Sequence, residues 1–369
     1  MVSQRLSIFA PSLAGGGAER VMCLVAGGLA ARGVDVTLVL CQACGPYLAD
    51  VDPRVRVVDL GASSMLHALL PLVRHLRKSR PTALLAAMSH ANVTAALAHC
   101  IARSHARLIL SEHAHLSSVL MASPGWRMRA TALMMRWTYP RADRIVSVSD
   151  GVTTDLLQRI PLDARRVVTI YNPVVGDILR TRSKAQPACV WLSARAPCDP
   201  PVVLAAGRFV PQKDFATLIE AFALLRRTRP ARLLILGEGD LRAPLTALVA
   251  RLGLQNDVAL PGFEPNPFPA MRAAQLFVLS SRFEGLGCVL IEAMACGTPV
   301  VSTDCPSGPR EVLEGGRWGR LVPVGDVTAL AAAMAAALDD PSPPRVRQRA
   351  EDFSVARAVQ HYAQELGVA

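Results

Sequence analysis

The sequence lacks the features that would place the protein in a membrane or outside the cell. No apolar stretch reaches the ~20 uninterrupted residues that span a bilayer. The N-terminal apolar run breaks at Pro11 and has no small-residue cleavage site of the kind found in signal peptides. We therefore expect a cytoplasmic protein.

The cysteines offer neither a disulfide framework nor a metal site. There are nine of them, an odd number, and they lie among apolar neighbours, which does not fit a set of paired bridges. Cys41 and Cys44 form a single Cys-x-x-Cys pair, whereas a structural zinc ion needs four ligands. The sequence predicts reduced structural thiols and no bound metal.

Aromatic and acidic side chains are both scarce. Nine Phe and four Tyr are too sparsely placed for the stacking platform that binds nucleic acid, so nucleic acid is not an expected partner. Forty Lys and Arg against 29 Asp and Glu leave a net charge of +11. This excess alone suits nucleic acid, an anionic membrane face or a phosphorylated substrate, and charge does not choose among the three.

The chain has 369 residues, a length that suits two domains. Short apolar runs alternate with helical stretches over residues 1–176 and again over 201–351, which is typical of parallel sheets covered on both faces. The strands are expected at 6–10, 34–40, 55–60, 83–88, 108–111, 145–149, 202–206, 232–236, 258–260, 276–279 and 299–302. Residues 177–200, rich in proline and polar side chains, indicate a linker.

We predict an α/β fold of two doubly wound, Rossmann-like domains that face each other across a cleft. The first domain is 1–176, with a C-terminal helix at 352–369 as a candidate to pack back onto it, and the second is 201–351. Ligands of such sheets bind beyond the carboxyl ends of the strands, so the cleft is the expected site.

A glycine-rich turn, residues 15–20 (GGGAER), follows the first strand and opens the first helix. Glycines there let the backbone of Gly16 and Gly17 approach an anion at the helix N-terminus. A dinucleotide fingerprint needs a further glycine where this chain has Arg20. The alternative is an ordinary tight turn between strand and helix.

A second turn, residues 207–214 (GRFVPQKD), lies in the matching position of the second domain. Two cations beside such a turn, Arg208 and Lys213, can neutralise a diphosphate as charge builds on a leaving group. The alternative is a pair of solvated surface cations.

Two carboxylates in residues 283–293 (FEGLGCVLIEA) carry the strongest signal. Glu284 lies in a glycine-flanked loop, and Glu292 lies in the following helix among apolar residues, where carboxylates are rare unless they bind something. Residues eight apart in a helix are at most about 12 Å from each other, too far to share a proton as a glycosidase pair does. The span suits two ends of one ligand, although spacing alone also allows a chance arrangement.

These motifs resemble those of retaining glycosyltransferases of family 4, which have a GT-B fold. The family's Glu-x7-Glu element matches Glu284 and Glu292, and its Gly-Arg-x4-Lys-Asp element matches residues 207–214. Further matching segments are 234–239, 297–302 and 305–311. The N-terminal half matches more loosely, through 15–20 and 111–113 (SEH).

The resemblance implies a role for each matched residue on the donor. Arg208 and Lys213 would grip the diphosphate, Glu292 would bind the ribose, and Glu284 would bind hydroxyls of the transferred sugar. Donor contacts are also implied for the two turns, at Gly16, Gly17, Gly285, Leu286 and Gly287. Alanine at Arg208 or Lys213 is expected to lower turnover about 100-fold and to leave folding unaffected.

The resemblance also places a histidine near the reacting centre. His113 directly follows the strand expected at 108–111 and is the candidate catalytic histidine, with His115 as the competing choice.

The implied reaction moves a hexose or N-acetylhexosamine from a nucleotide-diphosphate sugar, expected to be UDP-linked, to a glycan or polyprenyl-linked acceptor. Configuration would be retained by front-face attack, with no cofactor or metal. Segment 305–311 is similar to that of bacterial transferases in surface-polysaccharide and glycoconjugate assembly. The alternatives are a non-catalytic nucleotide-sugar binding protein and, less well matched, a nicotinamide-dependent oxidoreductase.

Two other segments bear on partners. Asp50 and Asp52 form an Asp-x-Asp, a metal signature of another glycosyltransferase fold, which we interpret here as an ordinary acidic loop. Residues 126–144 mix five arginines with Trp and Met side chains, as helices at membrane interfaces do. The alternative is a helix with one core face and one solvated basic face. Lipid-linked acceptors are common in the family, so we favour the inner membrane face.

Overall fold

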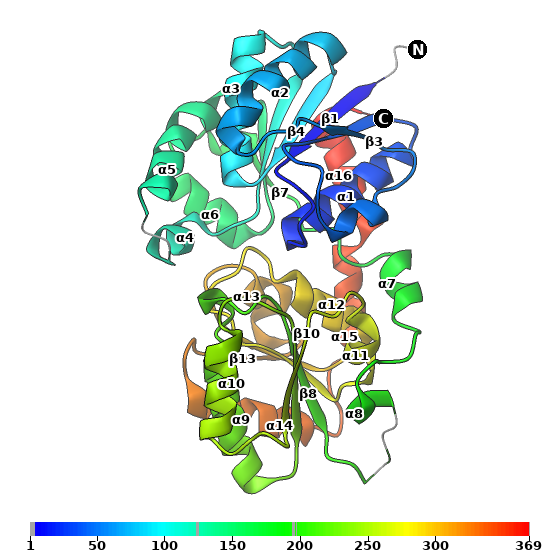
Figure 1. The fold of residues 1–369 in the computed structure, drawn as a ribbon, viewed down its shortest axis with the longest axis vertical. Helices are drawn as coiled ribbons and strands as arrows, with labels where there is room; N and C mark the ends of the chain where they lie inside the picture. Colours follow the sequence, from blue (N-terminus) through cyan, green and yellow to red (C-terminus); the bar gives the residue numbers. More distant parts are fainter. Residues whose placement is uncertain (1–3, 123–124, 194–195, 197, 369) are drawn as a thin grey trace. The chain divides into compact units, whose positions relative to one another are not determined.

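The computed structural model describes residues 4–122, 125–193, 196 and 198–368 (Figure 1). The chain divides into two compact units. Unit 1 consists of Met1–Pro173 and Val355–Ala369, and unit 2 consists of Val174–Ser354.

Unit 1 is built on a seven-stranded parallel sheet with the order β3-β2-β1-β4-β5-β6-β7. Its strands are β1 Arg5–Ala10, β2 Asp35–Leu40, β3 Arg56–Asp59, β4 Ala83–Ala87, β5 Arg107–Glu112, β6 Arg144–Ser147 and β7 Val167–Thr169. Its helices are α1 Gly17–Ala30, η1 Pro46–Asp50, α2 Met65–Ser79, α3 Ser89–Ala102, α4 Leu116–Ala122, α5 Trp126–Thr138, η2 Tyr139–Arg141, α6 Asp150–Arg159, η3 Ala164–Arg166 and α16 Val355–Leu366.

Strand β1 shows why this sheet needs helices on both faces. Leu6 and Ile8 belong to one apolar cluster with residues of α1 and α16, whereas Phe9 belongs to a second cluster with residues of α2, α3 and α5. Side chains alternate across a strand, so an apolar run buries both of its faces only inside such a sandwich.

Unit 2 repeats the design with a six-stranded parallel sheet in the order β10-β9-β8-β11-β12-β13. Its strands are β8 Val202–Ala206, β9 Arg232–Leu236, β10 Val258–Gly262, β11 Leu276–Leu279, β12 Val300–Thr303 and β13 Arg320–Val322. Its helices are α7 Asp177–Arg182, α8 Val190–Ser193, η4 Pro211–Lys213, α9 Phe215–Thr228, α10 Arg242–Arg251, α11 Phe268–Ala273, α12 Cys288–Cys296, α13 Pro309–Val312, η5 Glu314–Gly316, α14 Val327–Leu338, α15 Val346–Ala350 and η6 Glu351–Phe353.

The prediction of two doubly wound α/β domains is confirmed. Strands β7 and β13 were not predicted from the sequence. Each has only three residues and closes the edge of its sheet, so neither carries the buried apolar run by which the inner strands are recognised.

The segment predicted as a linker belongs to unit 2 in the structure. Within it, Leu179 of α7 and Leu192 of α8 are buried. The guanidinium of Arg232 lies 5.1 Å from the ring centroid of Trp191. Proline and polar residues predicted an open connection, but two short helices bury enough apolar surface to pack onto the unit. Residues 194, 195 and 197 of the predicted linker lie outside the described residues.

Helix α16 packs on unit 1, where Ala358 and Tyr362 join the cluster formed by β1 and α1. Its Glu365 carboxylate accepts a hydrogen bond from Arg144 Nε at 2.9 Å. Within the described part of the chain, no helix combines the length and the apolar character needed to cross a membrane.

Candidate functional site

In unit 2, the two strongest sequence motifs meet at one edge of the sheet. Strands β8 and β11 are parallel neighbours, so the loops that follow them leave from the same edge. The N–H of Arg282 donates to the carbonyl of Gln212 at 2.8 Å, and Gln212 Nε2 donates to the carbonyl of Phe283 at 2.9 Å. Ser280 Oγ donates to the carbonyl of Lys213 at 2.8 Å. The loops at 207–214 and 280–287 therefore form one layer.

Lys213 and Glu284 face each other within this layer. Lys213 Nζ lies 2.5 Å from Glu284 Oε1, and Ser281 Oγ donates to the same oxygen at 2.6 Å. The two side chains are only 17% and 8% exposed. Glu284 Oε2 accepts no hydrogen bond from the residues that the structure describes. This oxygen remains available to a ligand, while Oε1 fixes the position of the lysine.

A second ion pair joins the same two loops. Arg282 Nε lies 3.0 Å from Oδ2 of Asp214, whose side chain is 4% exposed. Asp214 adopts a left-handed conformation with φ of 48° as it opens α9, a strained backbone for a residue other than glycine. The paired guanidinium compensates the buried carboxylate and helps to hold this turn.

Arg208 differs from Lys213 in its surroundings. Its side chain is exposed, and it forms no ion pair or side-chain hydrogen bond with any described residue. The turn that carries it is crowded by backbone: a Cβ on Gly237 would lie 1.9 Å from the carbonyl oxygen of Gly207. Glycine at 237 is therefore required by close packing against the Arg208 turn.

The loop that holds Glu284 leads directly into α12. Gly287 has φ of 86° and precedes the first turn of the helix, and Glu292 is half-buried in the second turn. Ser307 Oγ donates to the carbonyl of Gly285 at 2.8 Å. A Cβ on Gly308 would lie 2.4 Å from the carbonyl oxygen of Leu286. Segment 305–311 thus supports the loop from behind, and the N-terminus of α12 offers backbone amides beside Lys213 and Glu284.

In unit 1, the glycine turn is arranged differently from the expectation. The N–H of Gly16 donates to Glu19 Oε2 at 2.7 Å, and Ser12 Oγ donates to Glu19 Oε1 at 3.3 Å. A buried carboxylate of the chain itself therefore occupies the N-terminus of α1. Gly17 is open, since nothing lies within 4 Å of the position of an added Cβ.

His113 follows β5 and is fixed by a buried carboxylate. Glu112 is 1% exposed. Its Oε1 accepts hydrogen bonds from the N–H of His113 at 3.1 Å and from Ser89 Oγ at 3.1 Å. Its Oε2 accepts from the hydroxyl of Tyr139 at 2.7 Å. Burial raises the pKa of Glu112 against the opposing effect of these donors, and burial lowers the pKa of His113 to about 4.

His115, the competing candidate, serves the local structure. Its Nε2 lies 3.8 Å from Asp155 Oδ1, and its Nδ1 lies 2.9 Å from Ser118 Oγ. Asp155 also accepts from the N–H of Ser117 at 3.0 Å, which anchors the start of α4. The Nδ1 atom of His115 is thus engaged by Ser118 of α4, whereas its Nε2 only faces the carboxylate of Asp155.

In the loop of Asp50 and Asp52, the second carboxylate pairs with a neighbouring arginine. Asp52 accepts two hydrogen bonds from the guanidinium of Arg54, at 2.9 and 2.7 Å, which lower the pKa of Asp52 to about 2. All nine cysteines are free. Nowhere in the described ranges do three or more His, Cys, Asp or Glu side chains gather as metal ligands would.

The basic segment predicted at 126–144 divides between core and surface. We expected the large apolar side chains of this segment at a membrane interface, but Met135 and Tyr139 are fully buried in the core of unit 1. Three large apolar side chains of α5 remain exposed: Trp126 at 75%, Leu133 at 58% and Trp137 at 64%.

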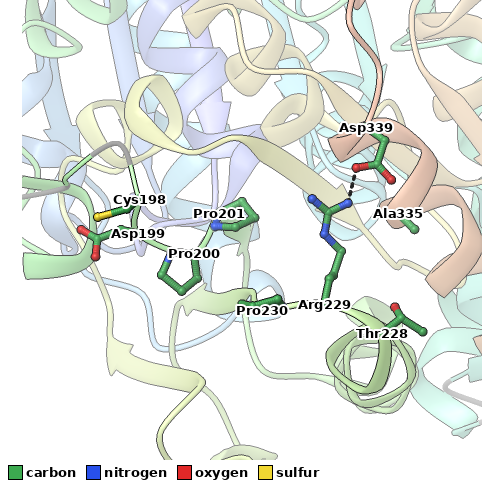
Figure 2. Close-up of a pocket in the computed structure, with 9 residues that line it drawn as sticks. All are labelled: Cys198, Asp199, Pro200, Pro201, Thr228, Arg229, Pro230, Ala335 and Asp339. Carbon is green, nitrogen blue, oxygen red and sulfur yellow. Dashed lines mark hydrogen bonds and ion pairs between the residues drawn. The ribbon is translucent and has the colours of Figure 1, made fainter.

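Unit 2 also has a hollow of about 470 Å³, which lies away from Lys213 and Glu284 (Figure 2). Its wall includes Pro201 and Pro230, which precede β8 and β9, so it lies at the opposite edge of the sheet from Lys213. Arg229 forms an ion pair there with Asp339 (Figure 2), and the hollow has no part in the site described above.

Sequence reasoning found the charged residues of the site but not their partners. Ser281, Arg282 and Gln212 lie inside or beside the motifs, yet ordinary polar residues carry no signal that they join two loops. In unit 1, the basic pattern of 126–144 gives no sign that Tyr139 is buried, because its burial depends on the fold.

Two family models match the chain. The model described as Glycosyltransferase Family 4 matches residues 15–175, and the model described as Glycosyl transferases group 1 matches residues 193–353.

Similar proteins act in glycan assembly according to their names. The chain is 31% identical over 327 residues to the lipopolysaccharide core biosynthesis glycosyltransferase LpsE of Rhizobium meliloti, which covers 86% of this chain and 84% of LpsE. It is 33% identical over 234 residues to the N-acetylgalactosamine-N,N'-diacetylbacillosaminyl-diphospho-undecaprenol 4-alpha-N-acetylgalactosaminyltransferase of Campylobacter jejuni. That match spans 63% of this chain and 61% of the relative.

The fold also has close counterparts among solved structures. HepE of Anabaena, determined in complex with UDP and glucose, superimposes with a TM-score of 0.78 at 22% identity over 99% of both chains. The sucrose-phosphate synthase of Thermosynechococcus elongatus superimposes with a TM-score of 0.81 at 21% identity over 98% of both chains.

Proposed function

The chain belongs to glycosyltransferase family 4 and has its GT-B fold, and from this premise we propose a specific reaction. The protein transfers a hexose or N-acetylhexosamine from a UDP-sugar to a glycan or lipid-linked glycan, with retention of configuration and without a metal. The observation that carries the proposal is the ion pair of Lys213 and Glu284, which joins the turn at 207–214 to the loop that leads into α12. Arg208 lies on the same turn as Lys213.

The charges of this layer suit a nucleotide diphosphate. Lys213 directs one of its three ammonium protons at Glu284 and keeps two for a ligand. Arg208 is an exposed cation on the same turn. Both cations bind the diphosphate and stabilise the charge that develops as UDP leaves. The amides at the N-terminus of α12 bind phosphate oxygens, and Glu292 binds the ribose.

Glu284 orients the sugar rather than attacking it. Its Oε1 is held by Lys213 and Ser281, so Oε2 is the oxygen that accepts a sugar hydroxyl. A carboxylate paired with an ammonium is a weak nucleophile, which favours front-face attack. In that mechanism a phosphate oxygen of the leaving group takes the acceptor's proton, and configuration is retained.

The names of the relatives support the class of acceptor. The Campylobacter relative is named for transfer to a diphospho-undecaprenol-linked sugar, and LpsE is named for the lipopolysaccharide core. We infer the same class for this chain: a growing glycan carried on a lipid or lipopolysaccharide.

For access to such an acceptor, we propose that the protein docks on an anionic bilayer through α5. Trp126, Leu133 and Trp137 are spaced by seven and four residues and therefore share one face of α5. Exposed Arg127 and Arg129 flank that face. A helix that presents Trp and Leu between arginines lies in the interface of an anionic membrane.

A non-catalytic nucleotide-sugar binding protein is the alternative, and one assay separates the two. The purified protein is incubated with a panel of nucleotide sugars and a lipid-linked glycan acceptor, and UDP release and product anomer are measured. We expect release from one UDP-sugar and a retained anomer. Tight binding of a donor without release over many hours would support the alternative, and an inverted product would reject the proposed mechanism.

A further inference from the structure

A buried chain of hydrogen bonds connects α16 to His113 in unit 1. The hydroxyl of Tyr362 lies 3.2 Å from Ser111 Oγ, and Ser111 Oγ lies 3.0 Å from His113 Nε2. Tyr362 and Ser111 are fully buried. Neither hydroxyl has another hydrogen-bond partner among the described residues.

The hydrogen bonds between Tyr362, Ser111 and His113 have a preferred donor direction, which runs from the tyrosine to the histidine. Burial raises the pKa of Tyr362 to about 12, so its hydroxyl keeps a proton and can donate it only to Ser111. The Ser111 proton is then directed at Nε2, and the neutral ring of His113 carries its own proton on Nδ1.

The opposite donor direction, from the histidine to the tyrosine, leaves more buried polar groups without a hydrogen-bond partner. If Nε2 carried the proton, Ser111 would donate to the Tyr362 oxygen, and the tyrosine O–H would be buried without an acceptor. The Nδ1 lone pair would also be unpaired. The first direction leaves only the Nδ1–H unpaired, and Nδ1 is the buried ring atom that has no partner in this structure. An unpaired buried donor costs roughly 1–3 kcal/mol, which an oxygen of a bound ligand would recover.

The backbone under the ring is already fixed by other groups. Glu112 accepts hydrogen bonds from the N–H groups of His113 and Ala114 at 3.1 and 3.3 Å. The rotation and the tautomer of the imidazole remain to be set. Among the described residues, Ser111 is the polar side chain that contacts the ring, and Tyr362 contacts Ser111.

We propose that Tyr362 is a positioning residue that acts through Ser111 to hold His113 as the Nδ1–H tautomer, so that the ring donates a hydrogen bond to an oxygen of the bound substrates. This inference rests on the proposed function for the place of His113 beside the substrates, but the tautomer itself does not.

The test is nuclear magnetic resonance of the full-length protein labelled with ¹⁵N-histidine. The signals of His113 are identified as those that disappear in the His113→Gln variant. We expect a proton on Nδ1 and none on Nε2 in the wild type. Tyr362→Phe removes only the hydroxyl and should give a mixture of tautomers, with kcat/KM lowered roughly 3–10-fold, as for the loss of one net hydrogen bond. Ser111→Ala should do the same, and the double variant should be no worse than Ser111→Ala alone, because the connection is already broken.

Several results would overturn the inference. A proton on Nε2 in the wild type would reverse the order of donors, and an unchanged tautomer in Tyr362→Phe would remove Tyr362 from the relay. Additive losses in the double variant would indicate two independent structural roles. Failure of the wild type to transfer any sugar would reject the proposed function, whereas the tautomer measurement would remain valid.

Discussion

The pairing of Lys213 with Glu284 makes two similar substitutions differ in their effect on stability. Removing one partner of a buried ion pair typically costs about 3–5 kcal/mol, because the other charge stays buried without compensation. Glu284 keeps the hydrogen bond from Ser281, so we expect Lys213→Ala to cost about 3 kcal/mol. At about 2–4 °C for each kcal/mol in a domain of this size, the Tm falls by roughly 6–12 °C.

Arg208→Ala is the matched control. Its side chain is exposed and unpaired in the described structure, so the free energy of unfolding should change by less than about 0.5 kcal/mol. Turnover should fall about 100-fold in both variants, because each removes a cation from the leaving group. The sequence alone predicted unaffected folding for both, and the structure changes that expectation for Lys213.

Thermal unfolding followed by circular dichroism, with UDP release measured on the same samples, separates the two effects. Lys213→Met combined with Glu284→Gln removes both charges and should restore most of the lost Tm while turnover stays low. If Lys213→Ala melts at the same temperature as Arg208→Ala, the ion pair does not stabilise the folded unit and the reasoning fails.

Three further outcomes are expected. The native pKa of His113 is about 4 against 6.5 for the free side chain, so the folded state binds fewer protons between these values. The stabilisation that comes from the neutral His113 ring is fully present above about pH 6.5. The free energy of unfolding then falls by up to roughly 3 kcal/mol as the pH drops to 4. His113→Gln should flatten this part of a plot of unfolding midpoint against pH, and an unchanged slope would mean that the ring is solvated. Transfer activity should survive EDTA, and a loss restored specifically by manganese would show that a metal takes part. In sedimentation with vesicles, the protein should bind anionic but hardly neutral lipid. Trp126→Ala with Trp137→Ala should abolish this binding, Arg129→Glu should weaken it, and equal binding to both vesicle types would contradict the docking proposal.

The sequence predicted the parts of the fold that depend on local pattern. Short apolar runs such as β8 and β11 predict buried strands. A strand that is apolar on both faces fits a parallel sheet that is covered by helices on both sides. The sequence did not predict the edge strands β7 and β13 or the short helices α7 and α8. Their packing depends on neighbours that are far away along the chain.

The candidate site was predictable in composition but not in arrangement. Motif spacing singled out Lys213 and Glu284, and the structure adds that they form an ion pair. The glycine turn predicted a free helix N-terminus, but the carboxylate of Glu19 three residues later bonds to Gly16. A pattern of residue types does not say which polar groups will bind each other rather than a ligand.

The return of α16 to unit 1 has a consequence for how the protein is made. Unit 2, Val174–Ser354, interrupts unit 1 in chain order, so a ribosome completes unit 2 before it supplies Tyr362 and Leu366 to the core around β1. During synthesis, unit 1 has an open apolar face that α16 later covers, and this incomplete state is the one most exposed to aggregation. Truncation before Val355 should therefore damage the unit at the other end of the sequence, and a slow final step of folding is expected in unit 1 rather than in unit 2.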